Sequence, residues 1–150
     1  MNNVESVPDS RTNFTAILEA RTTWEYHLPH FQQVITEGKV GALMASYNSI
    51  TDTDPKGVAV PTAASEGLMN GLVRGLWNSS LWVVSDYDAW KNVYATHSYC
   101  PDGPPSLECA GYAALNAGMD QEGGGDSAIS TLQQALDDKK TTLAKVQTAF

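Results

Sequence analysis

The chain has 150 residues, 42% of them hydrophobic, and its 17 acidic and 9 basic side chains give a formal net charge of −8. This length suits a single domain with a core, and the negative charge disfavours nucleic-acid partners and anionic membrane surfaces. No apolar run approaches the roughly 20 residues of a membrane helix, and the polar start has no signal-peptide pattern, so the sequence leaves localisation open.

The first part of the chain predicts a helix and then a strand. Residues 1–13 are polar and are interpreted as a tail or connector. From residue 24 to residue 37, apolar side chains recur at helical spacing, with Pro29 near the start of the main helix. The apolar run 40–46 predicts a buried strand, and residues 47–64, rich in Pro, Asp and Thr, predict a loop.

The second part repeats this alternation. Ser65 is a suitable N-cap for a helix that ends near Trp77, and residues 81–85 predict a second buried strand. Helices over 88–98 and 107–118 lead to a very short strand over 119–122, and Asp126 and Thr142 are candidate caps of two further helices. Helices that alternate with apolar strands predict an α/β fold with a parallel sheet.

Polar side chains follow the predicted strands: Tyr47 and Asn48, then Asp86, then Asp120. In parallel α/β sheets and barrels, active sites lie at the carboxyl ends of the strands, so we expect these groups to converge there. From the pattern alone, Asp86 could be a nucleophile, a general base or a helix cap, and capping is favoured. Tyr87 could stack on a sugar or cover the core, and the core is favoured.

Other candidate groups predict no metal or cofactor. His27 and His30 lack a third ligand at matching spacing, and Asp52 and Asp54 lack the glycine and glutamate of a calcium-binding loop. Asp88 is interpreted as a structural acid at a helix start. Cys100 and Cys109 flank a short loop and could form a disulfide or remain free thiols, and the sequence leaves both states open.

Five motifs follow one another along the chain: HLPHF, LMASYNS, LVRGLW, VVSDYDA and AALNAGMDQE. Their order and spacing resemble glycoside hydrolase family 3, which includes β-glucosidases and β-xylosidases. The resemblance implies that residues 14–150 are a fragment of the family's N-terminal domain, a TIM-like (β/α)8 barrel. Residues 41–46, 81–85 and 118–120 would be strands six, seven and eight, so the chain would hold roughly the last three βα units.

The resemblance also assigns roles to individual residues. Asp86 matches the catalytic nucleophile, Tyr47 matches a tyrosine close to that nucleophile, and Tyr87 holds a position that lines the sugar subsite. The implied activity is retaining hydrolysis of O-glycosidic bonds in a β-linked glucoside or xyloside.

In the family, the acid/base carboxyl comes from a domain that follows the barrel, so missing segments of the same parent protein are the expected partners. We therefore expect the isolated fragment to be inactive. The resemblance, the glycosylation sequons at Asn13 and Asn78 and the acidic composition also favour a secreted parent. The alternative is a non-catalytic carbohydrate-binding or inactive fragment derived from the barrel.

Overall fold

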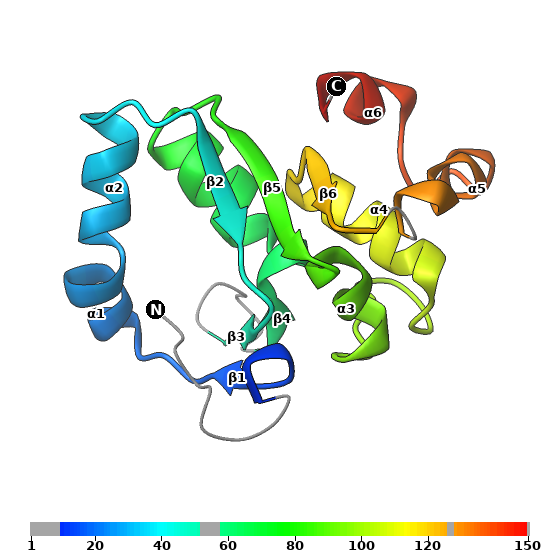
Figure 1. Ribbon diagram of the computed structural model, residues 1–150, viewed down its shortest axis with the longest axis horizontal. Coiled ribbons are helices and arrows are strands. Elements are labelled where there is room, and N and C mark those ends of the chain that lie inside the picture. The colour runs from blue at the N-terminus through cyan, green and yellow to red at the C-terminus, as the bar shows by residue number, and fades with distance from the viewer. Residues whose placement is uncertain (1–9, 52–57, 126–127, 150) are drawn as a thin grey trace.

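The computed structural model describes residues 10–51, 58–125 and 128–149 (Figure 1). Its main sheet has three parallel strands in the order β2 (Ala42–Ala45), β5 (Trp82–Tyr87) and β6 (Gln121–Gly123). Helices separate these strands along the chain, because parallel neighbours need a crossover that returns to the same end of the sheet. The expected α/β class with a parallel sheet is confirmed.

Helical segments precede, connect and follow these strands. Before β2 lie η1 (Ser10–Thr12), α1 (Ala20–Thr22), η2 (Thr23–His27) and α2 (Pro29–Thr36), and η4 (Gly67–Leu76) precedes β5. Between β5 and β6 lie α3 (Ala89–Ala95) and α4 (Leu107–Ala117). The chain then continues through η5 (Ile129–Thr131), α5 (Leu132–Asp137) and α6 (Leu143–Ala149).

The core lies between the sheet and the helices on both sides of β5 in the sequence, including α2 and η4 as well as α3 and α4. Val83 in β5 and Trp90 and Val93 in α3 have no exposed surface. The indole nitrogen of Trp90 donates to the carbonyl oxygens of Ala110 and Gly111 in α4, at 2.8 and 3.2 Å. Trp90 therefore buries a large apolar surface with its polar atom satisfied, which joins α3 firmly to α4.

The two strands predicted to be buried, at residues 40–46 and 81–85, are buried on one face only. Met44 in β2 is 62% exposed and Trp82 in β5 is 45% exposed, while Ala45 and Val83 are buried. Alternate side chains of a strand point to opposite faces, so one face of the sheet meets the helices and the other is open. Both Met44 and Trp82 belong to this open face, because Met44 pairs with Val84, two residues beyond Trp82.

The expectation of a plain loop over residues 47–64 is also wrong. This segment contains β3 (Ser49–Ile50), β4 (Val60–Pro61) and the 3-10 turn η3 (Thr62–Ala64). With β1 (Thr15–Ala16), the two strands form a second small sheet in the order β1-β3-β4. Because β1 and β3 are far apart in the sequence, their pairing leaves no local periodicity from which it could be predicted. Asp52, Asp54 and the candidate cap Asp126 lie outside the described residues.

The two predicted apolar helix faces are only partly buried. Leu28 and Ile35 are buried as expected, but Trp24 is 52% exposed and Val34 is 46% exposed. The helix starts earlier than predicted and contains a π-helical stretch at η2. The same widening occurs in η4, where Leu76 is 66% exposed. A π-turn accommodates an extra residue, so side chains beyond it rotate away from the face that a regular 3.6-residue repeat predicts.

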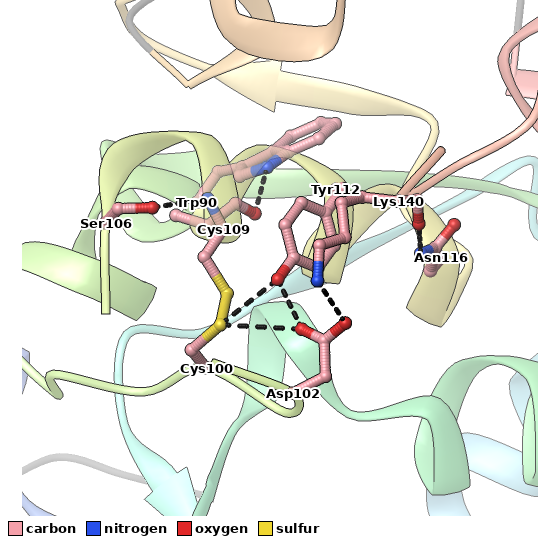
Figure 2. Close-up of a disulfide and its surroundings, with 9 residues drawn as sticks. Trp90, Cys100, Asp102, Ser106, Cys109, Tyr112, Asn116 and Lys140 are labelled. Atoms are coloured by element: carbon pink, nitrogen blue, oxygen red, sulfur yellow. Dashed lines mark hydrogen bonds and ion pairs between the residues drawn. A yellow bond between two sulfur atoms is a disulfide. The ribbon is translucent and has the colours of Figure 1, made fainter. Parts of the chain in front are cut away.

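Cys100 and Cys109 form a disulfide, with their Cα atoms 5.8 Å apart (Figure 2). The bond fastens the loop after α3 to the first turn of α4. That turn is capped by Ser106, whose hydroxyl oxygen accepts from the Cys109 amide at 3.0 Å. Of the two thiol states left open by the sequence, the structure therefore has the oxidised one.

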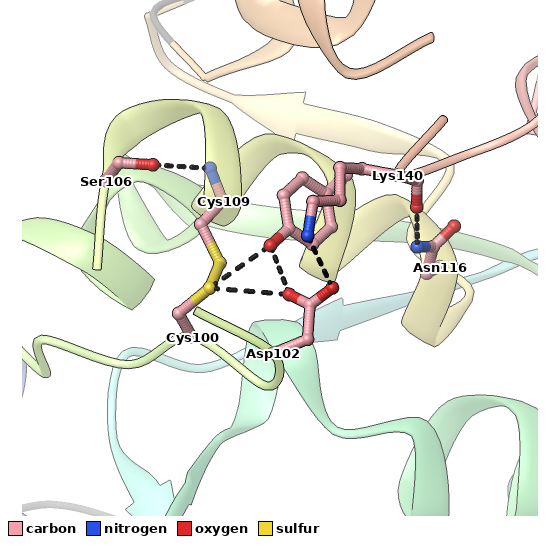
Figure 3. A network of polar contacts seen from close by, with 7 residues as sticks. Cys100, Asp102, Ser106, Cys109, Asn116 and Lys140 are labelled. Carbon is pink, nitrogen blue, oxygen red and sulfur yellow. Dashed lines mark hydrogen bonds and ion pairs between the residues drawn. A yellow bond between two sulfur atoms is a disulfide. The ribbon is translucent and has the colours of Figure 1, made fainter. Parts of the chain in front are cut away.

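A polar cluster lies beside the disulfide (Figure 3). Asp102 accepts a hydrogen bond from the hydroxyl of Tyr112 and forms an ion pair of 3.0 Å with Lys140. The Tyr112 hydrogen bond, followed by Lys140, lowers the pKa of the Asp102 carboxyl. Among the described residues, Cys100, Asp102 and Cys109 are grouped closely enough for metal ligation, but the disulfide consumes both thiolates that a metal would need.

Candidate active site

Asp86 lies near the carboxyl end of β5 and is half-buried. Its Oδ1 accepts a hydrogen bond of 2.7 Å from the amide of Tyr87 and one of 3.2 Å from the hydroxyl of Tyr47. Both hydrogen bonds are made to the same carboxylate oxygen. An arrangement of this kind fixes the carboxylate through one oxygen and leaves the other able to react.

Tyr47 reaches Asp86 from the loop that follows β2. Burial, followed by the negative charge of Asp86 and the hydrogen bond to it, raises the pKa of the Tyr47 phenol. The phenol therefore stays protonated at neutral pH and acts as a hydrogen-bond donor to Asp86. The guanidinium carbon of Arg11 lies 5.5 Å from the centre of the Tyr47 ring and opposes this rise in pKa through its positive charge.

Tyr87 and Asp88 follow the carboxylate on the exposed rim. The Tyr87 side chain is 72% exposed, so it does not cover the core as the pattern alone favoured. Asp88 has a left-handed backbone with φ of 59° and precedes α3 without a side-chain capping bond. Asp88 is thus a helix-start residue whose carboxylate makes no cap.

The position of Asp86 depends on a close approach between β5 and β6. The hydroxyl oxygen of Ser85 accepts from the Gly123 amide at 2.9 Å, and the register of the two strands is irregular here. A Cβ atom at Gly123 would lie 2.1 Å from the carbonyl oxygen of Ser85. Only glycine permits this contact, which holds β6 directly beside the residue that precedes Asp86.

Asp120 does not join Tyr47 and Asp86, which corrects the expected convergence of polar groups at the strand ends. The last strand spans Gln121–Gly123, so Asp120 precedes it and lies at its amino end. Its carboxylate accepts two hydrogen bonds from Nη2 of Arg74, at 2.8 and 3.0 Å, and one from the amide of Val83 at 2.7 Å. Asp120 therefore ties η4 and β5 to the start of β6.

Glu122 is also engaged away from the site. It is 6% exposed, and its Oε2 accepts from the amides of Ala128 and Ile129, at 3.2 and 3.1 Å. These contacts cap the start of η5, where backbone amides lack partners within the helix. A carboxylate held in this way is a structural group.

Sequence reasoning missed four residues that shape the site: Arg74, Ser85, His97 and Gly123. His97 contacts the carbonyl oxygen of Tyr47 through Nε2 at 2.7 Å and the hydroxyl of Ser49 through Nδ1 at 3.0 Å. Arg74 is part of the motif LVRGLW, and its importance could have been predicted from that motif. Ser85, His97 and Gly123 shape the site through contacts with residues far away in the sequence, which no local pattern reveals.

His27 and His30, the two histidines considered as metal ligands, lie in different helices. His30 is exposed in α2 and packs on Phe31, with ring centres 4.4 Å apart, whereas His27 ends η2. No helix in residues 10–51, 58–125 and 128–149 has both the length and the apolar character needed to cross a membrane.

Comparison with known proteins places the chain in a family. The sequence profile of the glycosyl hydrolase family 3 N terminal domain matches residues 7–150. A protein of Aspergillus flavus named "Probable exo-1,4-beta-xylosidase" is 36% identical over 137 residues, which cover 87% of this chain and 16% of that protein. Beta-D-xylosidase 3 of Arabidopsis thaliana is 24% identical over 115 residues, 77% of this chain and 14% of that protein.

Solved structures share the fold. A family 3 exo-β-xylosidase bound to a xylobiose aziridine probe superposes with a TM-score of 0.80 and 23% identity, over 93% of this chain and 17% of that one. A β-glucosidase from Listeria innocua in complex with isofagomine gives a TM-score of 0.76 and 19% identity, over 90% and 17%. The chain thus spans 16% of the length of the Aspergillus flavus relative. It belongs to glycosyl hydrolase family 3, and residues 7–150 match the N-terminal domain of that family.

Proposed function

We propose that this chain carries the nucleophile of a retaining β-glycosidase and that Asp86 is that nucleophile. The observation that carries the proposal is the hydrogen-bonded pair of Tyr47 and Asp86 at the carboxyl ends of neighbouring parallel strands. In β/α barrels this edge of the sheet carries the active site. The relatives in family 3 are named as glycosidases, which supports the same reaction class.

In the proposed reaction, the free oxygen of the Asp86 carboxylate attacks the anomeric carbon of the sugar. The bond to the leaving oxygen breaks as a covalent glycosyl-enzyme ester forms, and a second carboxyl group protonates the departing oxygen. That group then removes a proton from water, which attacks the anomeric carbon and releases Asp86 as a carboxylate. Tyr47 donates to Oδ1 and keeps the reacting carboxylate oriented.

Tyr87 is proposed to line the sugar subsite beside the nucleophile. Its side chain is 72% exposed and it directly follows Asp86. An exposed aromatic ring offers an apolar face on which the C–H groups of a sugar can pack.

The second carboxyl group is proposed to come from another part of a longer protein. Retaining enzymes place the two carboxyl groups about 5–5.5 Å apart. Asp120 forms an ion pair with Arg74, and Glu122 caps η5, so neither is available. Asp88 lies two residues beyond the nucleophile at a helix start, and we assign it a structural role.

We further propose that β2, β5 and β6 are strands six, seven and eight of the family's barrel, with the last strand at Gln121–Gly123 and not at residues 118–120 as the resemblance implied. Residues 14–150 would form that portion of the domain, and residues 1–13 a connector. The open face of the sheet supports this, because Met44 and Trp82 are apolar and exposed there. Such a face fits the interior of a barrel, which side chains from all the strands fill.

The proposed substrates are β-xylosides or β-glucosides. The curated relatives above are named as xylosidases, and the solved structures include a β-glucosidase. An aryl β-xyloside is therefore the first substrate to test, with the matching glucoside beside it.

The test compares Asp86→Asn with Asp88→Asn in the whole protein. Removing a nucleophile costs on the order of 10⁴-fold or more in turnover, so Asp86→Asn is expected to abolish release of the aryl group. Asp88→Asn is the matched control, because asparagine tolerates the left-handed backbone of Asp88, and its turnover should stay near wild type. Full turnover in Asp86→Asn would refute the assignment.

A further inference from the structure

His97 connects two parts of the site that are far apart in sequence. It follows α3, after the end of β5, and it contacts the loop that follows β2. Its Nε2 lies 2.7 Å from the carbonyl oxygen of Tyr47, and its Nδ1 lies 3.0 Å from the hydroxyl of Ser49. The imidazole ring thus bridges alternate residues of the segment that presents Tyr47.

The chemistry of the partners fixes the tautomer of His97. A carbonyl oxygen can only accept, so Nε2 carries the hydrogen and donates to Tyr47. In the neutral ring, Nδ1 is then an acceptor and receives the hydroxyl hydrogen of Ser49. Burial lowers the pKa of His97, which favours this neutral form.

Thr62 also holds this segment. The hydroxyl of Thr62 donates to the carbonyl oxygens of Ser46 and Asn48, the latter at 3.0 Å. Thr62 thus takes the carbonyls of the residues on either side of Tyr47, and His97 takes the carbonyl of Tyr47 itself.

We propose that His97 is a positioning residue of the site, which fixes the backbone of Tyr47 so that the phenol hydroxyl donates to Oδ1 of Asp86. This inference rests on the proposed function of Asp86. The chain of contacts runs from His97 Nε2 to the Tyr47 carbonyl at 2.7 Å, and from the Tyr47 hydroxyl to Asp86 at 3.2 Å. His97 acts on the carboxylate only through Tyr47.

The alternative is that His97 only fills space beside the segment that carries Tyr47 and Ser49. A glutamine side chain places an amide N–H near the position of Nε2, so His97→Gln keeps the donor to Tyr47, whereas His97→Ala removes it. Glutamine also has nearly the volume of histidine, so His97→Gln would restore a space-filling role as well. The roles are separated by the coupling of His97→Ala to Tyr47→Phe and by the Tyr47 resonance.

The kinetic test uses the whole protein and an aryl β-xyloside. We expect His97→Ala to lower kcat/KM by about tenfold, a loss typical of one misplaced group, and His97→Gln to restore most of it. In a Tyr47→Phe background, the further effect of His97→Ala should fall below about twofold, because residues that act as a unit are not additive. His30→Ala, an exposed histidine in α2, is the matched control and should leave kcat/KM unchanged.

A second measurement separates this inference from the proposed function. In the 150-residue chain labelled with ¹³Cζ-tyrosine, the Tyr47 resonance reports its hydrogen bond to Asp86 without any turnover. His97→Ala should shift this resonance and lower the raised pKa of Tyr47 towards its ordinary value, and His97→Gln should preserve both. If the wild-type protein shows no turnover, the proposed function fails and the Tyr47 resonance still decides the role of His97. An unchanged Tyr47 resonance in His97→Ala, or a His97→Gln variant as defective as His97→Ala, would overturn the positioning role.

Discussion

Replacing Arg74 by methionine should destabilise the fold strongly, because Arg74 holds three segments together. Its Nη2 donates twice to the Asp120 carboxylate and once to the carbonyl oxygen of Gly118, at 2.8 Å. Asp120 also accepts from the amide of Val83, so the arginine in η4 indirectly fixes the register of β5 and β6. Methionine keeps the apolar stem of the side chain but removes every one of these donors.

The magnitude follows from the burial of the pair. The side chains of Arg74 and Asp120 are 27% and 10% exposed. Removing one partner of a buried ion pair costs about 3–5 kcal/mol. Asp120 keeps its backbone donor at Val83 and Arg74 is partly solvated, so we expect a loss of about 2–4 kcal/mol in the free energy of unfolding for Arg74→Met.

Urea unfolding of the chain, followed by tryptophan fluorescence, measures this loss. The matched control is Arg21→Met, because Arg21 pairs with Glu25 at 2.9 Å with both side chains largely exposed, 83% and 63%. Such a surface pair contributes about 0.2–0.5 kcal/mol. If Arg74→Met costs no more than Arg21→Met, the ion pair does not hold the strands in register and the reasoning fails.

Two further predictions concern the surroundings of Asp86. Gly123→Ala should weaken folding and displace the end of β5, because the new methyl group would meet the Ser85 carbonyl oxygen at 2.1 Å, whereas Gly71→Ala, with its nearest neighbour at 3.7 Å, should not. Urea unfolding of both variants decides this, and equal stability would contradict it. The depressed pKa of His97, caused chiefly by burial, means that the unfolded chain takes up a proton first as the pH falls. Stability should therefore decline from about pH 6.5 down to the folded pKa of His97, and His97→Gln should flatten that decline; an identical pH profile in the variant would count against it.

The sequence predicted the fold class well, because the signals for it are local. The apolar runs that became β2 and β5 and the capped helix α4 could each be recognised from neighbouring residues. The second small sheet could not, since β1 pairs with β3 at Thr15 and Ser49, far apart in the chain. The π-helical widening of η2 and η4 likewise depends on tertiary packing, and it rotated Trp24 and Leu76 out of the predicted apolar faces.

The candidate site divides in the same way. Asp86 and Tyr47 could be named from their motifs, and the structure brings their side chains within 3.2 Å of each other. Asp120 was misplaced because a strand of three residues gives no periodicity from which to set its start. The contact of His97 with Tyr47 joins residues on different crossovers, so no pattern within the sequence could reveal it.

The central claim, that Asp86 is the nucleophile, is tested most directly by trapping the covalent intermediate. The whole protein is incubated with 2,4-dinitrophenyl 2-deoxy-2-fluoro-β-xyloside, whose leaving group needs little acid assistance, and its peptides are mapped by mass spectrometry. We predict one fluoroxylosyl group on the peptide that contains Asp86, located on that carboxylate, and none in Asp86→Asn. A fluoroxylosyl group on a different carboxylate, with Asp86 unmodified, would contradict it.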